Sequence, residues 1–294
     1  MSEEPDEPRQ VSVVIPTIGR TEPLSRCLES LAACRPAAAE IVVVDQSRDF
    51  ATAALVQEFA GAGARHVPCD GSGVSRGRND GLLAARHELV LVTDDDCTGP
   101  PDWVGTAWEL ASRHPGGIVT GRVLAAGDAL ATPSTIHDPR PRDLSGELRG
   151  GPLFPNNMVL PRRAVLDLGG FDERFGPEEA AEDNEFCYRW LKAGGALRYE
   201  PALVVWHHDW RSPEELRRLY VRYARGEGFF YAKHLRRGDA RMLLFLARQL
   251  AWGVRSLASA ALKRREDWTD SRRGILRGLP GGFVHGWRVY GREQ

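Results

Sequence analysis

The sequence is poor in cysteine and lysine and has no long uninterrupted apolar run. Its five cysteines are odd in number and lack the paired spacing of zinc ligands, so we expect neither a disulfide framework nor a structural zinc site. The apolar segment 242–262 is interrupted by Arg248, Gln249 and Arg255, which makes it a poor transmembrane span. Residues 1–10 are polar and acidic, so we expect a flexible start without a secretory signal and a cytoplasmic protein.

The chain also carries almost no net charge, but its charge is divided unevenly. The formal net charge is −1 over 294 residues. Residues 211–294 hold 19 Lys and Arg against 8 Asp and Glu, whereas residues 1–210 hold 20 against 32. The acidic body could hold a metal ion, and the basic tail could meet an anionic partner or a membrane surface. We do not expect nucleic acid as a partner.

The most informative stretch is an apolar strand, residues 90–93, that runs directly into Asp94, Asp95 and Asp96. Three adjacent carboxylates repel one another and need a compensating positive charge. Mg²⁺ or Mn²⁺ held by these oxygens is the natural candidate, and either ion would usually bring a phosphorylated substrate with it. A solvated acidic loop or a helix N-cap is the alternative interpretation.

The preceding residues predict half of a nucleotide-binding sheet. Residues 11–16 and 41–44 are apolar enough for buried strands, and a helical pattern follows each of them. The second strand delivers Asp45 to its carboxyl end, where an acidic residue often contacts a nucleoside, although Asp45 could equally be a turn residue. Arg76 or Arg78, in the glycine-rich segment that follows, could pair with a diphosphate. The segment lacks the Gly-Lys-Ser/Thr ending of a P-loop.

The second half of the chain adds a loop, a histidine and a basic helical tail. Residues 125–152 are rich in Pro, Gly, Asp and Arg, which predicts a mobile loop that could act as a lid over a bound substrate. An apolar strand at 203–206 ends at His207, whose imidazole could complete the coordination of a metal held by carboxylates. Ser212 is placed to cap a long helix. We favour packing on the preceding domain or a homodimer interface for the tail over peripheral membrane contact.

Several of these motifs resemble glycosyltransferase family 2. In the first half they are Val-Ile-Pro-Thr, Val-Val-Asp, Gly-Val-Ser-Arg-Gly-Arg-Asn, and Asp-Asp-Asp-Cys followed by Pro-Pro-Asp-Trp. In the second half they are residues 169–175 and 182–186. The resemblance implies an α/β GT-A fold, in which a Rossmann-like nucleotide-binding half-sheet is fused to an acceptor-binding half. It implies a GT-A domain over 11–226, with a donor half at about 11–123 and an acceptor half at about 153–226. A basic helical C-terminal extension would occupy 227–294.

The resemblance also assigns roles to individual residues. It implies an inverting transfer of sugar from a nucleoside diphosphate to an acceptor hydroxyl, with Asp183 as catalytic base and Glu182 behind it. An acid at a helix start is also favoured by the helix dipole alone, which is the alternative for both. The implied metal ligands are Asp94, Asp95, Asp96 and His207, and the implied donor-binding residues are Thr17, Arg20, Asp45, Arg78, Asp94, Asp95 and Asn157. Gln46 and Arg48 replace smaller residues that the family often has, which leaves UDP, GDP and dTDP open.

Three other functions are compatible with parts of the pattern. A haloacid-dehalogenase-type phosphatase would use Asp94 as nucleophile and Asp96 as general acid, but its acidic element usually opens the domain. It also needs a downstream lysine, and the chain has only Lys192, Lys233 and Lys263. A non-catalytic sugar-nucleotide or partner-binding module would not need both a metal motif and a candidate base. A sugar nucleotidyltransferase would need a glycine-rich, basic N-terminal loop, which residues 17–20 do not supply.

Overall fold

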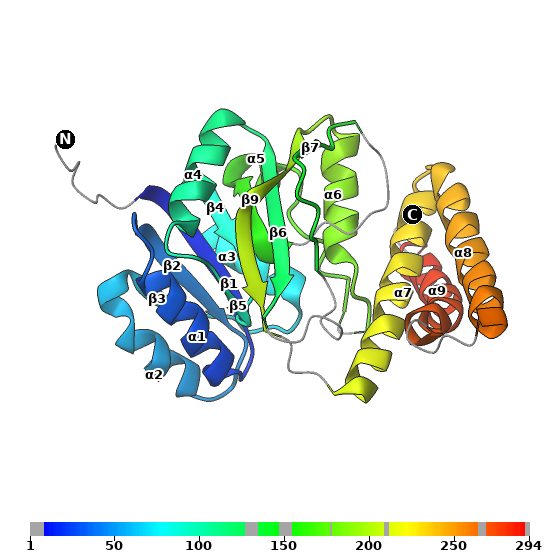
Figure 1. The fold of residues 1–294 in the computed structure, drawn as a ribbon, viewed down its shortest axis with the longest axis horizontal. Coiled ribbons are helices and arrows are strands. Elements are labelled where there is room, and N and C mark those ends of the chain that lie inside the picture. Colours follow the sequence, from blue (N-terminus) through cyan, green and yellow to red (C-terminus); the bar gives the residue numbers. More distant parts are fainter. Residues whose placement is uncertain are drawn as a thin grey trace. The chain divides into compact units, whose positions relative to one another are not determined.

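The computed structural model describes residues 9–126, 135–146, 155–176, 178–208, 212–263 and 269–291, without the side chains of 213, 256–263 and 269–273. The strands are β1 (Arg9–Thr17), β2 (Ala38–Asp45), β3 (Ala64–Pro68), β4 (Leu89–Val92), β5 (Cys97–Thr98), β6 (Ile118–Ala125), β7 (Arg142–Asp143), β8 (Met158–Pro161) and β9 (Leu197–His207). The α-helices are α1 (Thr21–Ala32), α2 (Ala51–Glu58), α3 (Val74–Ala84), α4 (Trp103–Arg113), α5 (Arg162–Asp167), α6 (Glu182–Lys192), α7 (Pro213–Arg236), α8 (Arg241–Lys263) and α9 (Thr269–Val289). Figure 1 shows these elements.

The chain divides into two compact units. The sheet unit comprises Met1–Phe171 and Phe186–Asp209, and the helical unit comprises Asp172–Glu185 and Trp210–Gln294. The domain boundary expected at residue 226 falls inside α7, because the basic helical pattern runs through that position without a break. Helix α6 begins in the helical unit and continues into the sheet unit.

The sheet unit contains one mixed sheet with the strand order β3-β2-β1-β4-β8-β6-β9-β5, and β7 pairs with β9 beside this path. Strands β3, β2, β1 and β4 are parallel, as the strand–helix repeats predict, while β8 runs antiparallel to both β4 and β6. The expected α/β class is therefore confirmed. The central residues of β1 and β2 are apolar on both sides of the strand, as expected where helices cover both faces of the sheet.

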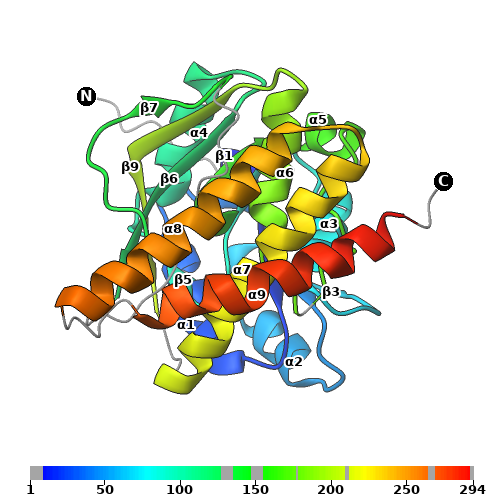
Figure 2. The same ribbon diagram turned by 90° about the vertical axis from the view of Figure 1, so that its right-hand side faces the viewer.

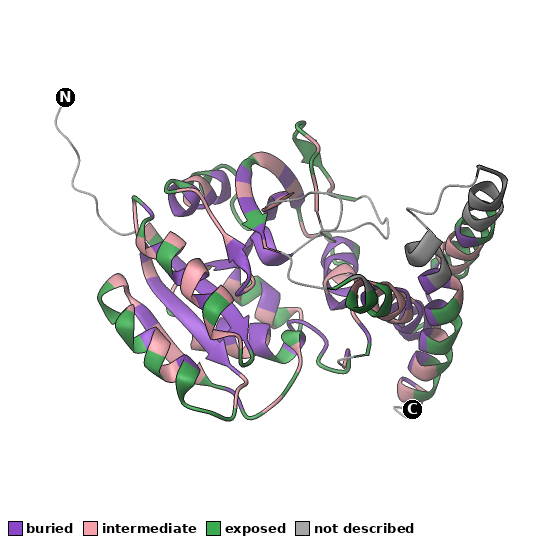
Figure 3. Cartoon of the chain, turned by 60° about the horizontal axis from the view of Figure 1, so that its bottom comes forward, coloured by how far each residue is buried: buried purple, intermediate pink, exposed green. Residues whose placement is uncertain are grey.

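Strand β1 shows how the two core layers form. Val13 and Ile15 point to the face that packs against α1 and α4, while Val14, between them, points to the face covered by α3. All three side chains are fully buried. Figure 3 shows the same pattern, with buried central strands and helices that alternate buried and exposed residues. This double-sided burial fixes the strand ends that carry the polar residues.

The expected mobile loop at 125–152 is only partly described. Residues 127–134 and 147–154 lie outside the described residues, as do residues 1–8 of the expected flexible N-terminus. Within the loop, Ile136 bridges to Val123, and β7 pairs with β9 through Arg142 and Asp143. This part of the loop is therefore bound to the sheet by backbone hydrogen bonds, which its composition did not predict.

The helical unit begins with the predicted cap. The Ser212 side chain accepts a hydrogen bond from the backbone of Glu215, whose carboxylate accepts one from the Ser212 backbone, so the two form a capping box. Helix α9 packs closely on α7 through glycines that leave no room for a side chain. Among the described residues, no helix has both the length and the apolar character needed to cross a bilayer.

Adjacent glycines of α9 give a matched test of this packing. A methyl group at Gly282 would collide with the backbone carbonyl of Arg225 in α7, whereas one at Gly281 would meet only the Arg225 side chain at 3.7 Å. We expect Gly282→Ala to lower the free energy of unfolding by about 1–3 kcal/mol, because the helices must separate. Gly281→Ala should raise it by about 1 kcal/mol, because alanine favours the helix. Guanidinium unfolding followed by circular dichroism measures both, and equal effects would contradict the close packing.

Candidate active site

The polar residues that end the parallel strands meet at one edge of the sheet unit. Strand β1 pairs with both β2 and β4, and its last residue, Thr17, lies opposite Asp45 in the register. Asp94 follows β4 by two residues. Carboxyl ends of neighbouring parallel strands therefore bring together three of the positions that the sequence singles out, as expected for a ligand site in an α/β sheet.

Asp95 and Asp96 share the guanidinium of Arg20. Arg20 forms an ion pair with Asp95, to which its Nε also donates at 3.2 Å, and its Nη1 donates to Asp96 Oδ2 at 3.0 Å. The Thr17 hydroxyl donates to Asp95 Oδ2 at 2.6 Å. Burial, together with the charges of Asp96 and Asp94, nevertheless raises the pKa of Asp95 to about 7, although Arg20 and Thr17 oppose the rise. Without a further positive charge, part of Asp95 would therefore be protonated near neutral pH.

Asp94 has a different cationic partner. Arg78 in α3 places Nη2 at 3.2 Å from Asp94 Oδ1, and the guanidinium lies over the ring of Phe171, 5.4 Å from its centroid. Arg78 is 3% exposed, so its charge acts in a poorly solvated place. The compensating charge that the three aspartates require is thus supplied in part by two arginines of the chain itself.

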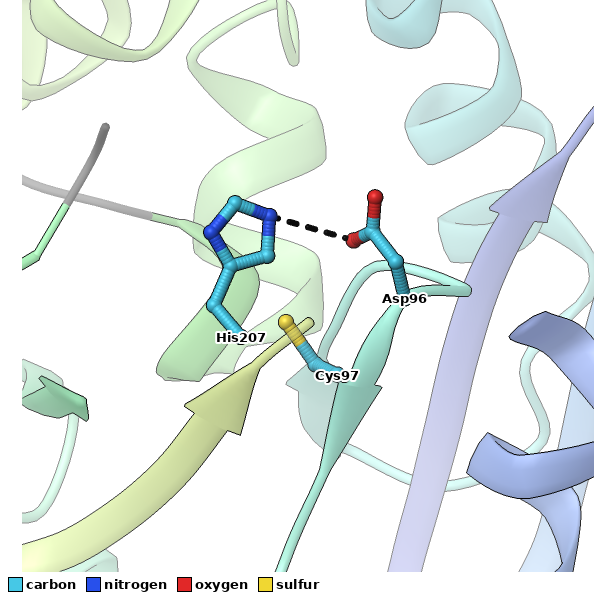
Figure 4. A group of neighbouring side chains, drawn as sticks. All are labelled: Asp96, Cys97 and His207. Atoms are coloured by element: carbon cyan, nitrogen blue, oxygen red, sulfur yellow. Dashed lines mark ion pairs between the residues drawn. The ribbon is translucent and has the colours of Figure 1, made fainter. Parts of the chain in front are cut away.

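His207 reaches the aspartates through strand pairing. It is the last residue of β9, and the short strand β5 pairs Cys97 with it in antiparallel register. The backbone N–H of His208 also donates to the carbonyl of Asp96 at 2.9 Å. As a result His207 Nε2 lies 3.4 Å from Asp96 Oδ1, and both residues are buried (Figure 4). The structure therefore places His207 beside the acidic element.

These residues fit a divalent cation. Ligand atoms of Asp96, Cys97 and His207 lie within 4.8 Å of one another. A separation of 3.4 Å between a carboxylate oxygen and an imidazole nitrogen suits two ligands of one ion, each at about 2.1 Å from it. Cys97 fits less well, because burial and the charges of Asp96 and Asp94 raise the pKa of its thiol well above the usual value, and Mg²⁺ and Mn²⁺ prefer oxygen. Asp96 and His207 would hold the ion, with phosphate and water oxygens as further ligands.

Asp45 is held by a neighbour that the sequence did not reveal. His66 on β3 places Nε2 at 2.9 Å from Asp45 Oδ2, and the backbone N–H of Ser47 donates to Oδ1 at 2.8 Å. The Ser47 hydroxyl in turn accepts a hydrogen bond from the backbone of Gly19 in the loop after β1. Burial opposes ionisation, but the bonds from Ser47 and His66 lower the pKa of Asp45 overall. The carboxylate is therefore charged and oriented at neutral pH.

Asn157, which the resemblance assigns to the donor site, is held inside the sheet unit by hydrogen bonds to other residues of the chain. It is fully buried, and its side-chain oxygen accepts a hydrogen bond from the indole of Trp103 at 3.0 Å. Its amide nitrogen donates to the backbone carbonyls of Arg122 and Leu203 at 2.8 and 3.0 Å. Both amide hydrogens are thus used to tie β6 and β9 together, and this geometry gives Asn157 a packing function within the sheet unit.

Helix α6 begins with Glu182 and Asp183, the two residues expected to provide the catalytic base. Glu182 is buried and Asp183 is partly exposed, and the first turn of the helix also contains Glu185. Asp183 Oδ1 accepts a hydrogen bond from the backbone N–H of Asn184 at 2.7 Å. Both candidates belong to the helical unit, whereas the aspartate cluster belongs to the sheet unit.

Comparison with known proteins identifies the chain. A sequence model described as Glycosyl transferase family 2 matches residues 12–161, about half of the chain. The chain belongs to glycosyltransferase family 2. The match covers every strand-end residue of the donor side described above, from Thr17 to Asp96, and stops before α6 and His207.

Individual relatives of this family 2 chain are distant. Pre-mycofactocin glycosyltransferase of Mycobacterium tuberculosis is 28% identical over 215 residues, which are 68% of this chain and 43% of the relative. Glucosyl-dolichyl phosphate glucuronosyltransferase of Haloferax volcanii is 23% identical over 179 residues, 57% of each chain. This chain therefore spans only about half the length of the curated relatives that it matches.

Solved structures confirm the GT-A fold. The mannosyltransferase PcManGT from Pyrobaculum calidifontis, in complex with GDP-Man and Mn²⁺, superposes with a TM-score of 0.63 at 18% identity, covering 96% of this chain and 90% of that one. S. aureus TarS superposes with a TM-score of 0.56 at 16% identity, covering 96% and 55%. Family membership and this fold leave the phosphatase interpretation without support. Lys233, one of the lysines that such a phosphatase could have used, is instead paired with the carboxylates of Asp172 and Glu185 in the helical unit.

Lys233 also explains how this family 2 protein holds the segment that leads into Glu182 and Asp183. The Lys233 ammonium, on α7, lies 2.6 Å from both Asp172 Oδ2 and Glu185 Oε1, and all three residues are buried. Asp172 additionally accepts a hydrogen bond from Tyr290 at 2.6 Å, and His234 lies 2.9 Å from Glu185. Two ends of the segment Asp172–Glu185 are thus tied to α7, and sequence reasoning missed this function for the basic C-terminal helices.

Proposed function

We propose that the protein is a metal-dependent, inverting glycosyltransferase that moves a sugar from a nucleoside diphosphate to an acceptor hydroxyl. The observation that carries the proposal is the approach of His207 Nε2 to Asp96 Oδ1 at 3.4 Å, beside two arginine–aspartate pairs that each have one buried partner. Such a site suits a diphosphate accompanied by a cation. The PcManGT complex with GDP-Man and Mn²⁺, which has the same fold, supports this interpretation.

The donor would be held by residues of the sheet unit. Asp45, charged and oriented by His66, would accept hydrogen bonds from the nucleoside, and Thr17 ends the neighbouring strand. Arg78 would face the phosphate oxygens, as a buried guanidinium pairs well with them. A Mn²⁺ or Mg²⁺ ion on Asp96 and His207 would offset the negative charge that develops on the leaving diphosphate.

The transfer itself needs a base on the acceptor side. Asp183 would take the proton of the acceptor hydroxyl while that oxygen attacks the anomeric carbon. The bond between this carbon and the diphosphate oxygen breaks in the same displacement, and the electron pair leaves with the nucleoside diphosphate. A single in-line displacement inverts the anomeric centre. Glu182, buried one position earlier, would support the base.

Calorimetric titration of the folded protein with UDP, GDP and dTDP tests the donor site. Each nucleotide is titrated with Mn²⁺, with Mg²⁺ and with EDTA. We expect one nucleotide to bind with metal and to lose at least about tenfold in affinity in EDTA. Asp96 and His207 would contribute only two of the ion's ligands and the diphosphate oxygens would contribute others, so removing the ion removes a link between nucleotide and protein. GDP is the first choice because PcManGT was solved with GDP-Man. Equal binding with and without metal would refute the metal-dependent site.

A further inference from the structure

The outer face of α8 combines exposed apolar side chains with arginines. Leu243, Leu244 and Val254 are 52%, 57% and 57% exposed, and Trp252 is 47% exposed. The opposite face packs inward in the helical unit through residues such as Met242, which is fully buried. In Figure 2, α8 faces the viewer along the length of the helix, as does α9.

The charges on this helix all have one sign. Arg241, Arg248 and Arg255 are exposed and recur every seven residues, so they form a row along one side of α8. The sequence of α8 contains no Asp or Glu. Leu244 and Trp252 lie beside this row, within a quarter turn of it, whereas Leu243 and Val254 lie about a third of a turn away on one flank of the same exposed surface.

We propose that this face of α8 docks on an anionic lipid membrane surface, with its apolar side chains in the interface and its arginines against the headgroups. A helix with exposed leucines, an interfacial tryptophan and a row of arginines has the character of a helix that lies in the plane of a bilayer surface. Anionic headgroups supply the negative charge that α8 lacks, and each nearby arginine strengthens the attraction. The helix does not need to cross the membrane for this contact.

A second copy of the chain is the less suitable occupant. In a twofold dimer the same face meets itself, so the arginine row of one α8 would lie near that of the other. No acidic side chain of α8 could compensate this repulsion. Charge complementarity therefore favours the membrane surface. This inference concerns a face of the helical unit without proposed catalytic residues, and it does not depend on the proposed function.

Vesicle co-sedimentation of the full chain tests the proposal. We expect binding to vesicles containing phosphatidylglycerol, and at least about tenfold weaker binding to pure phosphatidylcholine. High salt should weaken the binding by screening the arginines. Failure of the folded wild-type protein to bind the anionic vesicles would overturn the proposal.

Two pairs of variants separate this face from the rest of the surface. The double variant Leu244→Ser/Trp252→Ser should lose binding to both kinds of vesicle, and Arg248→Gln/Arg255→Gln should lose the preference for anionic lipid. The matched controls are Leu83→Ser, at a 66% exposed leucine of α3, and Arg163→Gln, at an exposed arginine of α5, and both should bind like wild type. Controls that lose as much binding as the α8 variants would overturn the assignment to α8.

Sedimentation velocity without lipid addresses the second copy directly. The proposal expects Leu244→Ser/Trp252→Ser to leave the oligomeric state unchanged over a range of protein concentrations. A wild-type dimer that this variant dissociates would show that α8 is covered by another chain, and would replace the membrane proposal. Circular dichroism confirms that each variant is folded.

Discussion

Asp96→Asn should remove metal-dependent nucleotide binding and lower kcat/KM by about 10³-fold or more. Asp96 is the carboxylate that lies 3.4 Å from His207, and both side chains are buried where the ends of β5 and β9 pair. A neutral amide is a much weaker ligand for Mn²⁺ or Mg²⁺, and a metal that neutralises a leaving group contributes several kcal/mol, with about 1.4 kcal/mol for each factor of ten. Calorimetry with the preferred nucleotide and Mn²⁺, followed by steady-state kinetics, measures both effects.

Two further variants make this result specific to the metal site. His207→Ala should also weaken the apparent metal affinity, because it removes the second proposed ligand. Cys97→Ala is the matched control within the cluster, since the thiol lies near the same atoms but is a poor ligand for a hard ion, and alanine adds no new donor. We expect Cys97→Ala to keep wild-type metal dependence. Unchanged metal dependence in both Asp96→Asn and His207→Ala would place the ion elsewhere.

Asp183→Asn should lower kcat by about 10²–10⁴-fold while nucleotide affinity stays within about twofold of wild type. The amide cannot accept the acceptor proton, but the proposed nucleotide ligands are other residues of a different compact unit. The two readouts therefore separate a chemical function from a structural one. Turnover with a transferable acceptor gives kcat, and calorimetry gives the affinity.

Glu178→Gln is the matched control for Asp183. Glu178 is an exposed acid of the same segment, so its replacement removes one negative charge near the start of α6 without touching the proposed base. We expect nearly wild-type kcat. Equal losses of kcat in Asp183→Asn and Glu178→Gln would mean that the acids act only through the helix dipole. Loss of nucleotide binding in Asp183→Asn would assign this residue a structural function.

Local patterns in the sequence predicted several features correctly. Apolar runs bounded by polar residues identified β1, β2 and β4 and placed Asp45 and Asp94 near their ends. The Ser212 cap was predicted from four adjacent residues and is present with its partner Glu215. Such features depend on hydrogen bonds and burial among near neighbours in the chain, so the sequence contains them directly.

Other features depend on which distant strands become neighbours. The two-residue strand β5 has no sequence signal of its own, yet its pairing with β9 brings His207 to Asp96 and leaves Asp95 to Arg20 and Thr17. The His66–Asp45 contact likewise requires β3 to lie beside β2. No local sequence pattern predicts these strand pairings. The sequence therefore indicated all three aspartates equally as metal ligands and could not predict which residue each would contact.

By itself the sequence determined the α/β class, the order of strands and helices in the donor half, and the chemical types that gather at the strand ends. These follow from periodicity, capping and the position of acids after apolar runs. Only the tertiary structure decided that Asp96 approaches His207, that Arg20 and Arg78 pair with the other aspartates, and that Lys233 binds the ends of the segment carrying the proposed base. The reason is physical: buried ion pairs form between residues that are distant along the chain, and folding brings them together through strand order and helix packing.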